Sequence, residues 1–230
     1  MSASVQSMFD AIAGRYDRLN RVLSAGRDKA WRRKAIGLLP APGSRKRVLD
    51  LCGGTGDFCL ALRSAGVASA CVIGDFSRPM LARAAAKPGL SAQAVAMDAL
   101  QPPFRAGVFD GVLCGFGMRN LDDLDRGIRA AHALLGSGGV FITLEFFKPE
   151  TRFTRFFYRV LAPVFIPLGG WLLASRRDAY AYLVRSVLGF CGVAEYARLC
   201  RAAGFERVEA SACDFGIAHV VVAVKGKVGP

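Results

Sequence analysis

Apolar residues recur along this chain with different periods, and the changes of period divide it into regions. Over about residues 5–38, apolar positions return every three to four residues, which is typical of amphipathic helices; they are Phe9, Ile12, Tyr16, Leu19 and Leu23. The stretch Pro40-Ala41-Pro42-Gly43 then predicts a break in the chain. We therefore expect an N-terminal helical cap over residues 1–42.

Between Val48 and about Phe146, short apolar runs alternate with stretches of helical pattern. This alternation is typical of a doubly wound parallel sheet with helices on both faces. Its last part predicts a helix over 122–135, a glycine stop at 136–139 and a strand over 140–146. Near the end of the chain we expect a helix over 193–203 and two closing strands, 208–212 and 219–225.

Residues 150–190 interrupt this alternation. An apolar stretch within them, 160–174, is shorter than the about 20 residues that a membrane-spanning helix needs, and it holds two prolines and is flanked by arginines. Two interpretations stay open. The insertion is a lid or a segment that dips into the membrane interface, or it is buried and packed on the sheet.

Size and composition favour a single domain over residues 1–230. Hydrophobic residues make up 53% of the 230, which argues against a disordered chain. No basic stretch followed by an apolar core opens the sequence, so we expect no secretory signal and a cytoplasmic protein. The seven cysteines contain no C-x-x-C pair, which favours buried, reduced thiols over disulfides and predicts no metal site.

The charge is strongly positive, with 31 Lys and Arg against 18 Asp and Glu. Basic clusters lie at 32–34, 45–47, 152–159 and 176–177. An anionic membrane surface and nucleic acid both attract such charge. Because no zinc-finger or RNP-type signature accompanies it, we expect no specific nucleic-acid binding and favour peripheral association with the inner face of the membrane.

A glycine-rich turn follows the first predicted strand. The strand 48–51 leads into Cys52-Gly53-Gly54-Thr55-Gly56, and a helix is predicted to begin near Asp57. Bare backbone at such a turn lets a nucleotide-like ligand approach closely. Asp75, at the end of the next apolar run, stands where a βαβ unit holds ribose hydroxyls.

The ligand of this turn is either a dinucleotide or S-adenosylmethionine. A dinucleotide fingerprint needs a third small residue, and Cys59 matches that position only in part. Asp57 would repel a pyrophosphate at the helix N-terminus but would suit a ligand without phosphate that carries positive charge. Asp57 serving as a plain N-cap is the alternative.

Asp98 supports the methyl donor. It follows the apolar-leaning run 92–96 and precedes two prolines, so it would lie at a strand end near an adenine amine. A solvated turn aspartate is the alternative. Another buried-strand pattern, 109–117, ends in glycines at the same edge of the sheet.

Three further stretches are similar to a known family. They are residues 8–20 with 23–32, the run Gly115-Phe116-Gly117-Met118-Arg119-Asn120-Leu121, and 179–186 with 203–205. With them the chain resembles the ubiquinone and menaquinone biosynthesis C-methyltransferases, also called demethylmenaquinone methyltransferases. The resemblance implies a class I S-adenosylmethionine-dependent methyltransferase fold, with a Rossmann-like, seven-stranded, mostly parallel sheet. It also implies methylation of a ring carbon of a polyprenylated quinol.

The resemblance assigns candidate roles to residues. Arg119 would stabilise the phenolate and orient a water, Asn120 would bond the ring oxygen, and Tyr16 would close the pocket over both ligands. Without the resemblance, a surface ion pair with Asp122 or Asp123 would be favoured for Arg119. The residues expected to bind S-adenosylmethionine are Asp50, Gly53, Gly54, Thr55, Gly56, Asp57, Asp75, Phe76, Met97, Asp98 and Ala99. Neither histidine, His132 or His219, is favoured as a base.

Other functions remain open from the sequence. The acceptor could be a soluble aromatic secondary metabolite, or the chain could be a non-catalytic cofactor-binding scaffold in a quinone biosynthesis complex. The sequence distinguishes neither a naphthoquinol from a benzoquinol acceptor nor a monomer from a homodimer.

Overall fold

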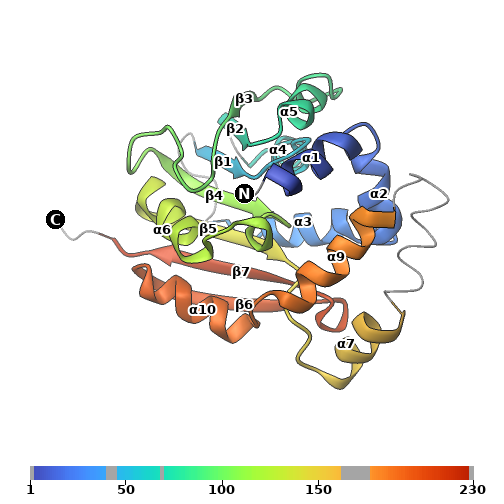
Figure 1. Ribbon diagram of the computed structural model, residues 1–230. Coiled ribbons are helices and arrows are strands. Elements are labelled where there is room, and N and C mark those ends of the chain that lie inside the picture. The colour runs from blue at the N-terminus through green and yellow to red at the C-terminus, as the bar shows by residue number, and fades with distance from the viewer. Residues whose placement is uncertain (1–2, 40–45, 68–69, 162–176, 228–230) are drawn as a thin grey trace.

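The strands of the molecule form one twisted sheet. The computed structural model describes residues 3–39, 46–67, 70–161 and 177–227, and within them a seven-stranded sheet has the order β3-β2-β1-β4-β5-β7-β6 (Figure 1). All neighbours are parallel except β7, which runs antiparallel to β5 and β6. This confirms the expected seven-stranded, mostly parallel sheet and its two closing strands, which run antiparallel to each other. The strands are β1 (Arg47–Leu51), β2 (Ala70–Asp75), β3 (Gln93–Ala96), β4 (Phe109–Gly115), β5 (Leu135–Glu145), β6 (Phe205–Cys213) and β7 (Ala218–Lys225).

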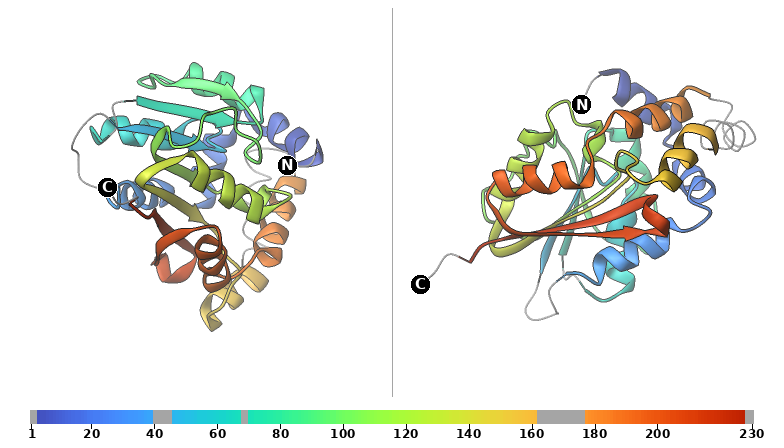
Figure 2. Two further views of the ribbon diagram at one scale, coloured as in Figure 1. Left: turned by 90° about the vertical axis from the view of Figure 1, so that its left-hand side faces the viewer. Right: turned by 90° about the horizontal axis from the view of Figure 1, so that it is seen from below.

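Helices cover both faces of the sheet (Figure 2). One face packs against α6 (Leu124–Leu134) and α10 (Val193–Ala202), and the other against α3 (Asp28–Ile36), α4 (Asp57–Ser64) and α5 (Arg78–Ala85). Successive residues of a strand serve opposite faces: Val112 and Cys114 join one core, and Leu113 between them joins the other. Burial on both sides explains why the central strands are continuous apolar runs in the sequence.

The N-terminal cap consists of three helices, α1 (Ala3–Ile12), α2 (Tyr16–Leu23) and α3. The predicted helical pattern is confirmed, but it is broken between α2 and α3. There Ala25 and Gly26 have positive φ angles of 49° and 76°, outside the helical region. Helices α1 and α2 therefore lie over the edge of the sheet where the parallel strands end, whereas α3 packs on one face (Figure 1).

The predicted glycine stop at 136–139 is wrong in one respect. Helix α6 ends at Leu134, and β5 begins directly at Leu135, so the glycines lie inside the strand. The pairing with β4 shifts register between Phe109 and Gly111, and Gly138 has a φ of 72°. The glycines thus form an irregularity of the β-bulge kind. In the sequence, such glycines cannot be told from a loop that ends a helix.

The insertion is described at both of its ends. It contains α7 (Arg152–Phe156), the π-helical turn η2 (Phe157–Leu161) and α9 (Arg177–Gly189). The apolar stretch 160–174 lies outside the described residues except for 160 and 161, as do the predicted break at 40–43 and the basic residues Arg45 and Arg176. Among the helices that the structure describes, none has the length and apolarity to cross a membrane.

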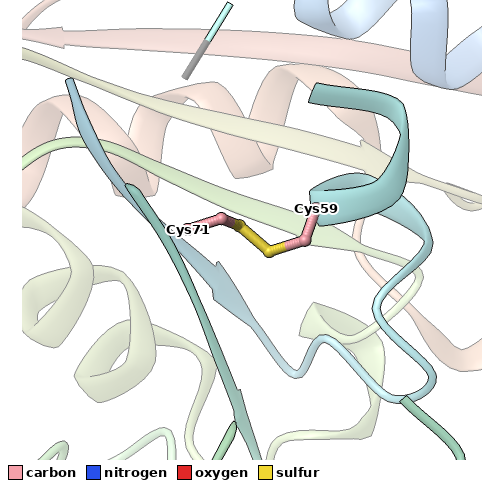
Figure 3. The surroundings of a disulfide bond; sticks show 2 residues. All are labelled: Cys59 and Cys71. Atoms are coloured by element: carbon pink, nitrogen blue, oxygen red, sulfur yellow. A yellow bond between two sulfur atoms is a disulfide. The ribbon is translucent and has the colours of Figure 1, made fainter. Parts of the chain in front are cut away.

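Two cysteines are joined, which corrects the expectation of seven reduced thiols. Cys59 of α4 and Cys71 of β2 form a disulfide (Figure 3), with their Cα atoms 5.8 Å apart. The packing of α4 on β2 brings together two residues that no local motif relates. The other five, Cys52, Cys114, Cys191, Cys200 and Cys213, are free thiols.

Candidate functional site

The glycine turn connects β1 to α4 in a left-handed backbone conformation. Gly54 and Gly56 have φ angles of 54° and 77°. A Cβ on Gly56 would lie 2.7 Å from side-chain atoms of Ile73 and Leu90, so only glycine fits between them. Gly53 donates a backbone hydrogen bond of 3.1 Å to Gly74 of β2. The turn is therefore fixed against the neighbouring strand.

A cavity of about 600 Å³, here called the glycine-turn pocket, opens beside this turn. Its walls come mainly from the carboxyl ends of β1, β2, β3 and β4, and α1 and α2 cover it with Phe9 and Tyr16. Six of the residues predicted to bind the cofactor line it: Gly54, Asp75, Phe76, Met97, Asp98 and Ala99. Ligands of open α/β sheets bind at this edge.

Asp75 is held by backbone donors. Its carboxylate accepts hydrogen bonds of 2.8 Å from the backbone N–H of Gly54 and of 2.8 Å from that of Ser77. Burial raises the pKa of the Asp75 carboxyl, and these backbone hydrogen bonds lower it by less. The carboxylate retains lone pairs toward the pocket, which suits a neighbouring pair of hydroxyl groups.

Asp98 and its neighbours close the far side of the glycine-turn pocket. Asp98 accepts a hydrogen bond of 2.9 Å from the backbone N–H of Leu100, so its carboxylate is also oriented by the turn that follows β3. Gly74 lies against Met97, and a Cβ there would come within 2.9 Å of the Met97 methyl carbon. The pocket thus offers acids at two points and an apolar wall between them.

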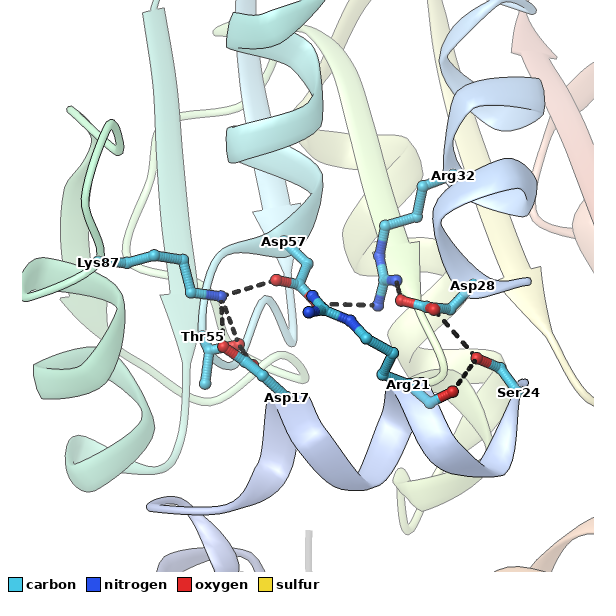
Figure 4. A network of polar contacts seen from close by, with 8 residues as sticks. All are labelled: Asp17, Arg21, Ser24, Asp28, Arg32, Thr55, Asp57 and Lys87. Carbon is cyan, nitrogen blue, oxygen red and sulfur yellow. Dashed lines mark hydrogen bonds and ion pairs between the residues drawn. The ribbon is translucent and has the colours of Figure 1, made fainter. Parts of the chain in front are cut away.

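Asp57 does not reach the pocket. It is the first residue of α4, whose N-cap is Gly56, and its carboxylate pairs with Lys87 at 2.7 Å and Arg32 at 3.4 Å (Figure 4). Burial alone would raise the pKa of Asp57, but these two cations hold it below its usual value. Asp57 therefore balances charges of the protein itself. It is neither the N-cap that the alternative interpretation gave nor a wall of the pocket.

The other predicted cofactor residues support the turn from outside the pocket. Thr55 is buried and donates a hydrogen bond of 2.5 Å to Asp17 of α2, which also pairs with Lys87 at 2.9 Å (Figure 4). Asp50 lies under the turn, where a Cβ on Gly53 would meet its carboxyl carbon at 2.8 Å. Burial raises the pKa of Asp50 to about 7, although Arg32 lowers it. One Asp50 carboxyl oxygen has no hydrogen-bond partner among the described residues.

A second cavity of about 970 Å³, here called the aromatic pocket, adjoins the first. The two share Phe9, Tyr16 and Phe116 as a common wall. The aromatic pocket is mostly apolar and draws on α1, α2, α3, η2 and α9 as well as the strand ends; its other lining residues are Met8, Ile12, Asn20, Ser24, Asp28, Trp31, Arg119, Phe146, Phe157, Tyr158, Tyr182, Leu183 and Ile217.

Arg119 lies between this pocket and a buried acid. It belongs to the 3₁₀ turn η1 (Met118–Asn120) after β4, and its Nη1 donates hydrogen bonds of 2.6 Å to Glu145 and 2.7 Å to the Phe116 carbonyl. The Glu145 side chain is fully buried. Burial alone would lower the pKa of Arg119, but Glu145 raises it; burial raises the pKa of Glu145 in spite of Arg119. The surface ion pair with Asp122 or Asp123 is thereby replaced by a buried one.

Helix α9 supports both residues of the predicted catalytic pair. The Tyr182 hydroxyl donates a hydrogen bond of 2.8 Å to Asn120 Oδ1, and Arg119 Nε donates one of 3.3 Å to Ser186 Oγ. Asn120 itself is buried and lines the glycine-turn pocket. The structure therefore places Tyr16, Arg119 and Asn120 around the junction of the two pockets.

The sequence reasoning missed Glu145, Tyr182 and Asn20. A charged residue that ends an apolar strand, as Glu145 does, is the signal that could have found the first. Asn20 lines the aromatic pocket, and its buried amide nitrogen has no hydrogen-bond partner among the described residues. Neither histidine lines either pocket: His132 packs on Phe205 and His219 on Phe147.

Comparisons with known sequences identify relatives over nearly the whole chain. The model of the ubiE/COQ5 methyltransferase family matches residues 1–225. A demethylmenaquinone methyltransferase of Thermus thermophilus is 39% identical over 94% of this chain and 98% of its own, and one of Deinococcus radiodurans is 40% identical over 96% and 92%. A ubiquinone/menaquinone biosynthesis C-methyltransferase of Geotalea uraniireducens is 36% identical over 96% of each chain.

Solved structures share the fold at low sequence identity. A methyltransferase from Thermotoga maritima that depends on S-adenosylmethionine superimposes with a TM-score of 0.68 at 18% identity, covering 95% of this chain and 98% of its own. The cyclase SpnF superimposes with a TM-score of 0.70 at 16% identity, over 97% and 96%. The architecture is that of the class I methyltransferases.

Proposed function

Because this chain belongs to the ubiE/COQ5 methyltransferase family, we propose that it methylates a ring carbon of a polyprenylated quinol with S-adenosylmethionine. The acceptor is demethylmenaquinol, the benzoquinol intermediate of ubiquinone synthesis, or both. One observation carries the proposal: two cavities of different chemistry meet at a wall of Phe9, Tyr16 and Phe116. A donor in one and an acceptor in the other would meet at that wall.

The glycine-turn pocket fits S-adenosylmethionine. Asp75, fixed by two backbone N–H groups, would accept hydrogen bonds from the ribose hydroxyls, and Asp98 would accept one from the adenine amine. Gly54 would let the backbone approach the ligand, since the nearest atom to a Cβ there, in Tyr16, lies 3.9 Å away. When bound, S-adenosylmethionine supplies an electrophilic sulfonium methyl group.

The aromatic pocket fits the ring of a quinol. Trp31, Phe116 and Phe146 pack against one another, with ring centroids 4.6 to 6.3 Å apart, and offer apolar surface to a flat ring. Arg119 contributes the positive charge that a phenolate needs, and its Nη2 has no hydrogen-bond partner recorded among the described residues. The free amide nitrogen of Asn20 is a further donor for a ring oxygen.

Within this arrangement each side chain has a defined task. An aromatic carbon becomes nucleophilic when a ring hydroxyl is ionised, so Arg119 would favour the phenolate and orient a water that removes its proton. Arg119 is not the base, because its guanidinium stays protonated. Asn120, oriented by Tyr182, would bond the ring oxygen. Tyr16 would lie over both ligands, and burial raises the pKa of its hydroxyl, which keeps it a neutral donor. Positioning the two reactants supplies much of the rate.

The acceptor also suggests where the protein works. A polyprenyl tail resides in lipid, and the net charge of +13 favours an anionic surface, so we place the protein at the inner face of the membrane. None of the helices within the described residues could span that membrane.

Two measurements test the function. The purified protein, S-adenosylmethionine and a reduced demethylmenaquinone should yield the methylated ring, detected by mass. Cells lacking the protein should accumulate a quinone that lacks one methyl group. The ring system of that quinone, naphthoquinone or benzoquinone, would identify the acceptor. Turnover of a soluble phenolic metabolite in place of either quinol would contradict the proposal.

Arg119→Gln separates binding from chemistry. We expect unchanged affinity for S-adenosylhomocysteine by calorimetry and a loss of turnover of roughly 10²–10³-fold, the scale of one transition-state charge contact. Unchanged turnover would remove Arg119 from the mechanism.

A further inference from the structure

Large apolar side chains protrude at one end of the insertion. Phe153, Phe156 and Val160 of α7 and η2 are each about half exposed, and Phe215 of the 3₁₀ turn η3 (Asp214–Gly216) is 86% exposed. The Phe153 and Phe215 rings lie 5.9 Å apart, so the two elements form one surface. We call these four residues the phenylalanine patch. Such exposure costs free energy in water and marks an interaction surface.

Three kinds of residue occupy different sides of the segment 152–160. Positions 153, 156 and 160 carry the exposed apolar side chains, and the neighbouring positions 152, 155 and 159 carry exposed arginines. Thr154 and Tyr158 are buried on the remaining side. No acid occurs between residues 151 and 161. Apolar and basic rows side by side are typical of helices that lie in the interface of an anionic membrane.

The turn that presents Phe215 is held firmly. Phe215 has a φ of 58°, a conformation that bulky residues rarely adopt. Its neighbour Asp214 accepts hydrogen bonds from Arg27 Nε at 2.8 Å, Arg27 Nη2 at 2.5 Å and Trp31 Nε1 at 2.7 Å. Such a conformation persists only where the surroundings fix it, and here they fix a phenylalanine in an outward position.

The patch adjoins the aromatic pocket through its own elements. Phe157 and Tyr158 of η2, and Ile217 beside η3, line the pocket, while their neighbours Phe156 and Phe215 face outward. The Tyr158 hydroxyl donates a hydrogen bond of 2.9 Å to the Ile217 carbonyl, which joins the two elements at the pocket wall. A surface that holds the patch would therefore lie next to the acceptor cavity.

We propose that the phenylalanine patch and Arg152, Arg155 and Arg159 dock this protein on an anionic lipid bilayer, with the aromatic pocket beside the membrane. The occupant is a bilayer because the exposed apolar side chains lie beside arginines. The apolar side chains suit lipid acyl chains, and the arginines suit the anionic headgroups next to them. This surface deepens the proposed function and rests on it, since a lipid-borne quinol must enter from that side.

The test is flotation of the full-length protein with vesicles of phosphatidylglycerol and phosphatidylcholine in equal parts. Phe153→Ser, Phe156→Ser and Phe215→Ser should each weaken binding about tenfold or more, the scale of burying one large apolar side chain. The Arg152→Gln/Arg155→Gln/Arg159→Gln variant should bind like wild type at high salt and far more weakly at low salt. Leu38→Ser is the matched control. Leu38 is also exposed, but it follows the C-terminal end of α3, whereas Arg27, which bonds the turn that presents Phe215, precedes the N-terminal end.

The outcomes separate this surface from the function. Vesicle binding needs no turnover, so it is measured independently of the reaction. Phe215→Ser should methylate a quinol with a short, soluble tail as wild type does and lose activity only on quinol embedded in vesicles. Wild-type flotation by all three phenylalanine variants would overturn the proposal. Variants that float like wild type but change from dimer to monomer by light scattering would also overturn it, because the patch would then hold a second copy of the chain. Failure of wild type on both quinols would refute the function and leave the docking result standing.

Discussion

The glycine-turn pocket and the aromatic pocket share a wall but are built differently. The first takes most of its lining from four strand ends and the turns that follow them, where short stretches of sequence carry whole parts of the site. The second is assembled from α1, α2, α3, η1, η2, α9, the residues just after β4 and β5, and Ile217, separated by up to about two hundred residues. The glycine-turn pocket is thus a local property of a common fold, whereas the aromatic pocket depends on how distant helices pack.

The polar contacts follow the same division. Around the glycine turn, Asp75 and Asp98 are oriented by nearby backbone N–H groups. Arg119 lines the aromatic pocket and Asn120 lines the adjoining glycine-turn pocket. Both are oriented by side chains of β5 and α9, 26 to 67 residues away in sequence. Damage to the second set should therefore affect both turnover and the packing of the insertion.

The largest expected effect comes from Glu145→Gln. It leaves the Arg119 charge buried without its partner, so the free energy of unfolding should fall by about 3–5 kcal/mol in a denaturant titration. Turnover should fall with it. The double variant Glu145→Leu/Arg119→Met should regain most of the stability but none of the turnover. A single variant as stable as wild type would contradict the role of the pair.

Asp50→Asn tests the support beneath the glycine turn. The Asp50 carboxyl has a pKa of about 7 in the folded protein against an ordinary value of 3.8, so the folded protein binds an extra proton between these pH values. Wild-type stability should therefore fall as the pH rises from about 4 to about 7 and then level off. About three pH units at about 1.4 kcal/mol each give an upper limit of about 4 kcal/mol. Asn, which stays neutral, should remove this fall in thermal unfolding measured across that range; an unchanged pH profile would be evidence against a buried neutral Asp50.

Asp75→Ala should break the cofactor side alone. Loss of the carboxylate that faces the glycine-turn pocket should weaken S-adenosylhomocysteine binding about a hundredfold, the scale of hydrogen bonds to a charged group. Asp57→Ala is its matched control, since Asp57 pairs with Lys87 and Arg32 outside the pocket and should change the affinity less than tenfold. If calorimetry showed the larger loss of affinity for Asp57→Ala, then Asp57 and not Asp75 would be the residue that binds the cofactor.

Tyr182→Phe gives the smallest expected effect and the finest test of the acceptor side. Removing one hydrogen bond to Asn120 should lower kcat about fivefold, equivalent to about 1 kcal/mol. Binding of S-adenosylhomocysteine should not change. A loss of cofactor affinity with unchanged kcat would mean that Asn120 serves the cofactor in the glycine-turn pocket and not the acceptor.

At Asp57 and at two of the cysteines, the structure differs from the interpretation of the sequence. The argument that Asp57 repels phosphate assumed that its carboxylate faces the ligand, but Lys87, thirty residues further on, neutralises it. The cysteines were expected to be reduced because no motif links them, yet Cys59 and Cys71 meet where α4 packs on β2. In both cases the deciding partner is distant in sequence, so local pattern carries no signal of it.

The sequence by itself determined the alternation of strands and helices, the glycine turn, and the acids that end the second and third strands. These follow from periodicity and from the backbone needs of a turn, which a few consecutive residues settle. Only the tertiary structure decided that Arg119 faces Glu145, that α9 holds Arg119 and Asn120, and that Phe157, Tyr158 and Ile217 line one cavity. Burial, ion pairing and cavity shape depend on which distant surfaces meet, and those meetings exist only once the chain has folded.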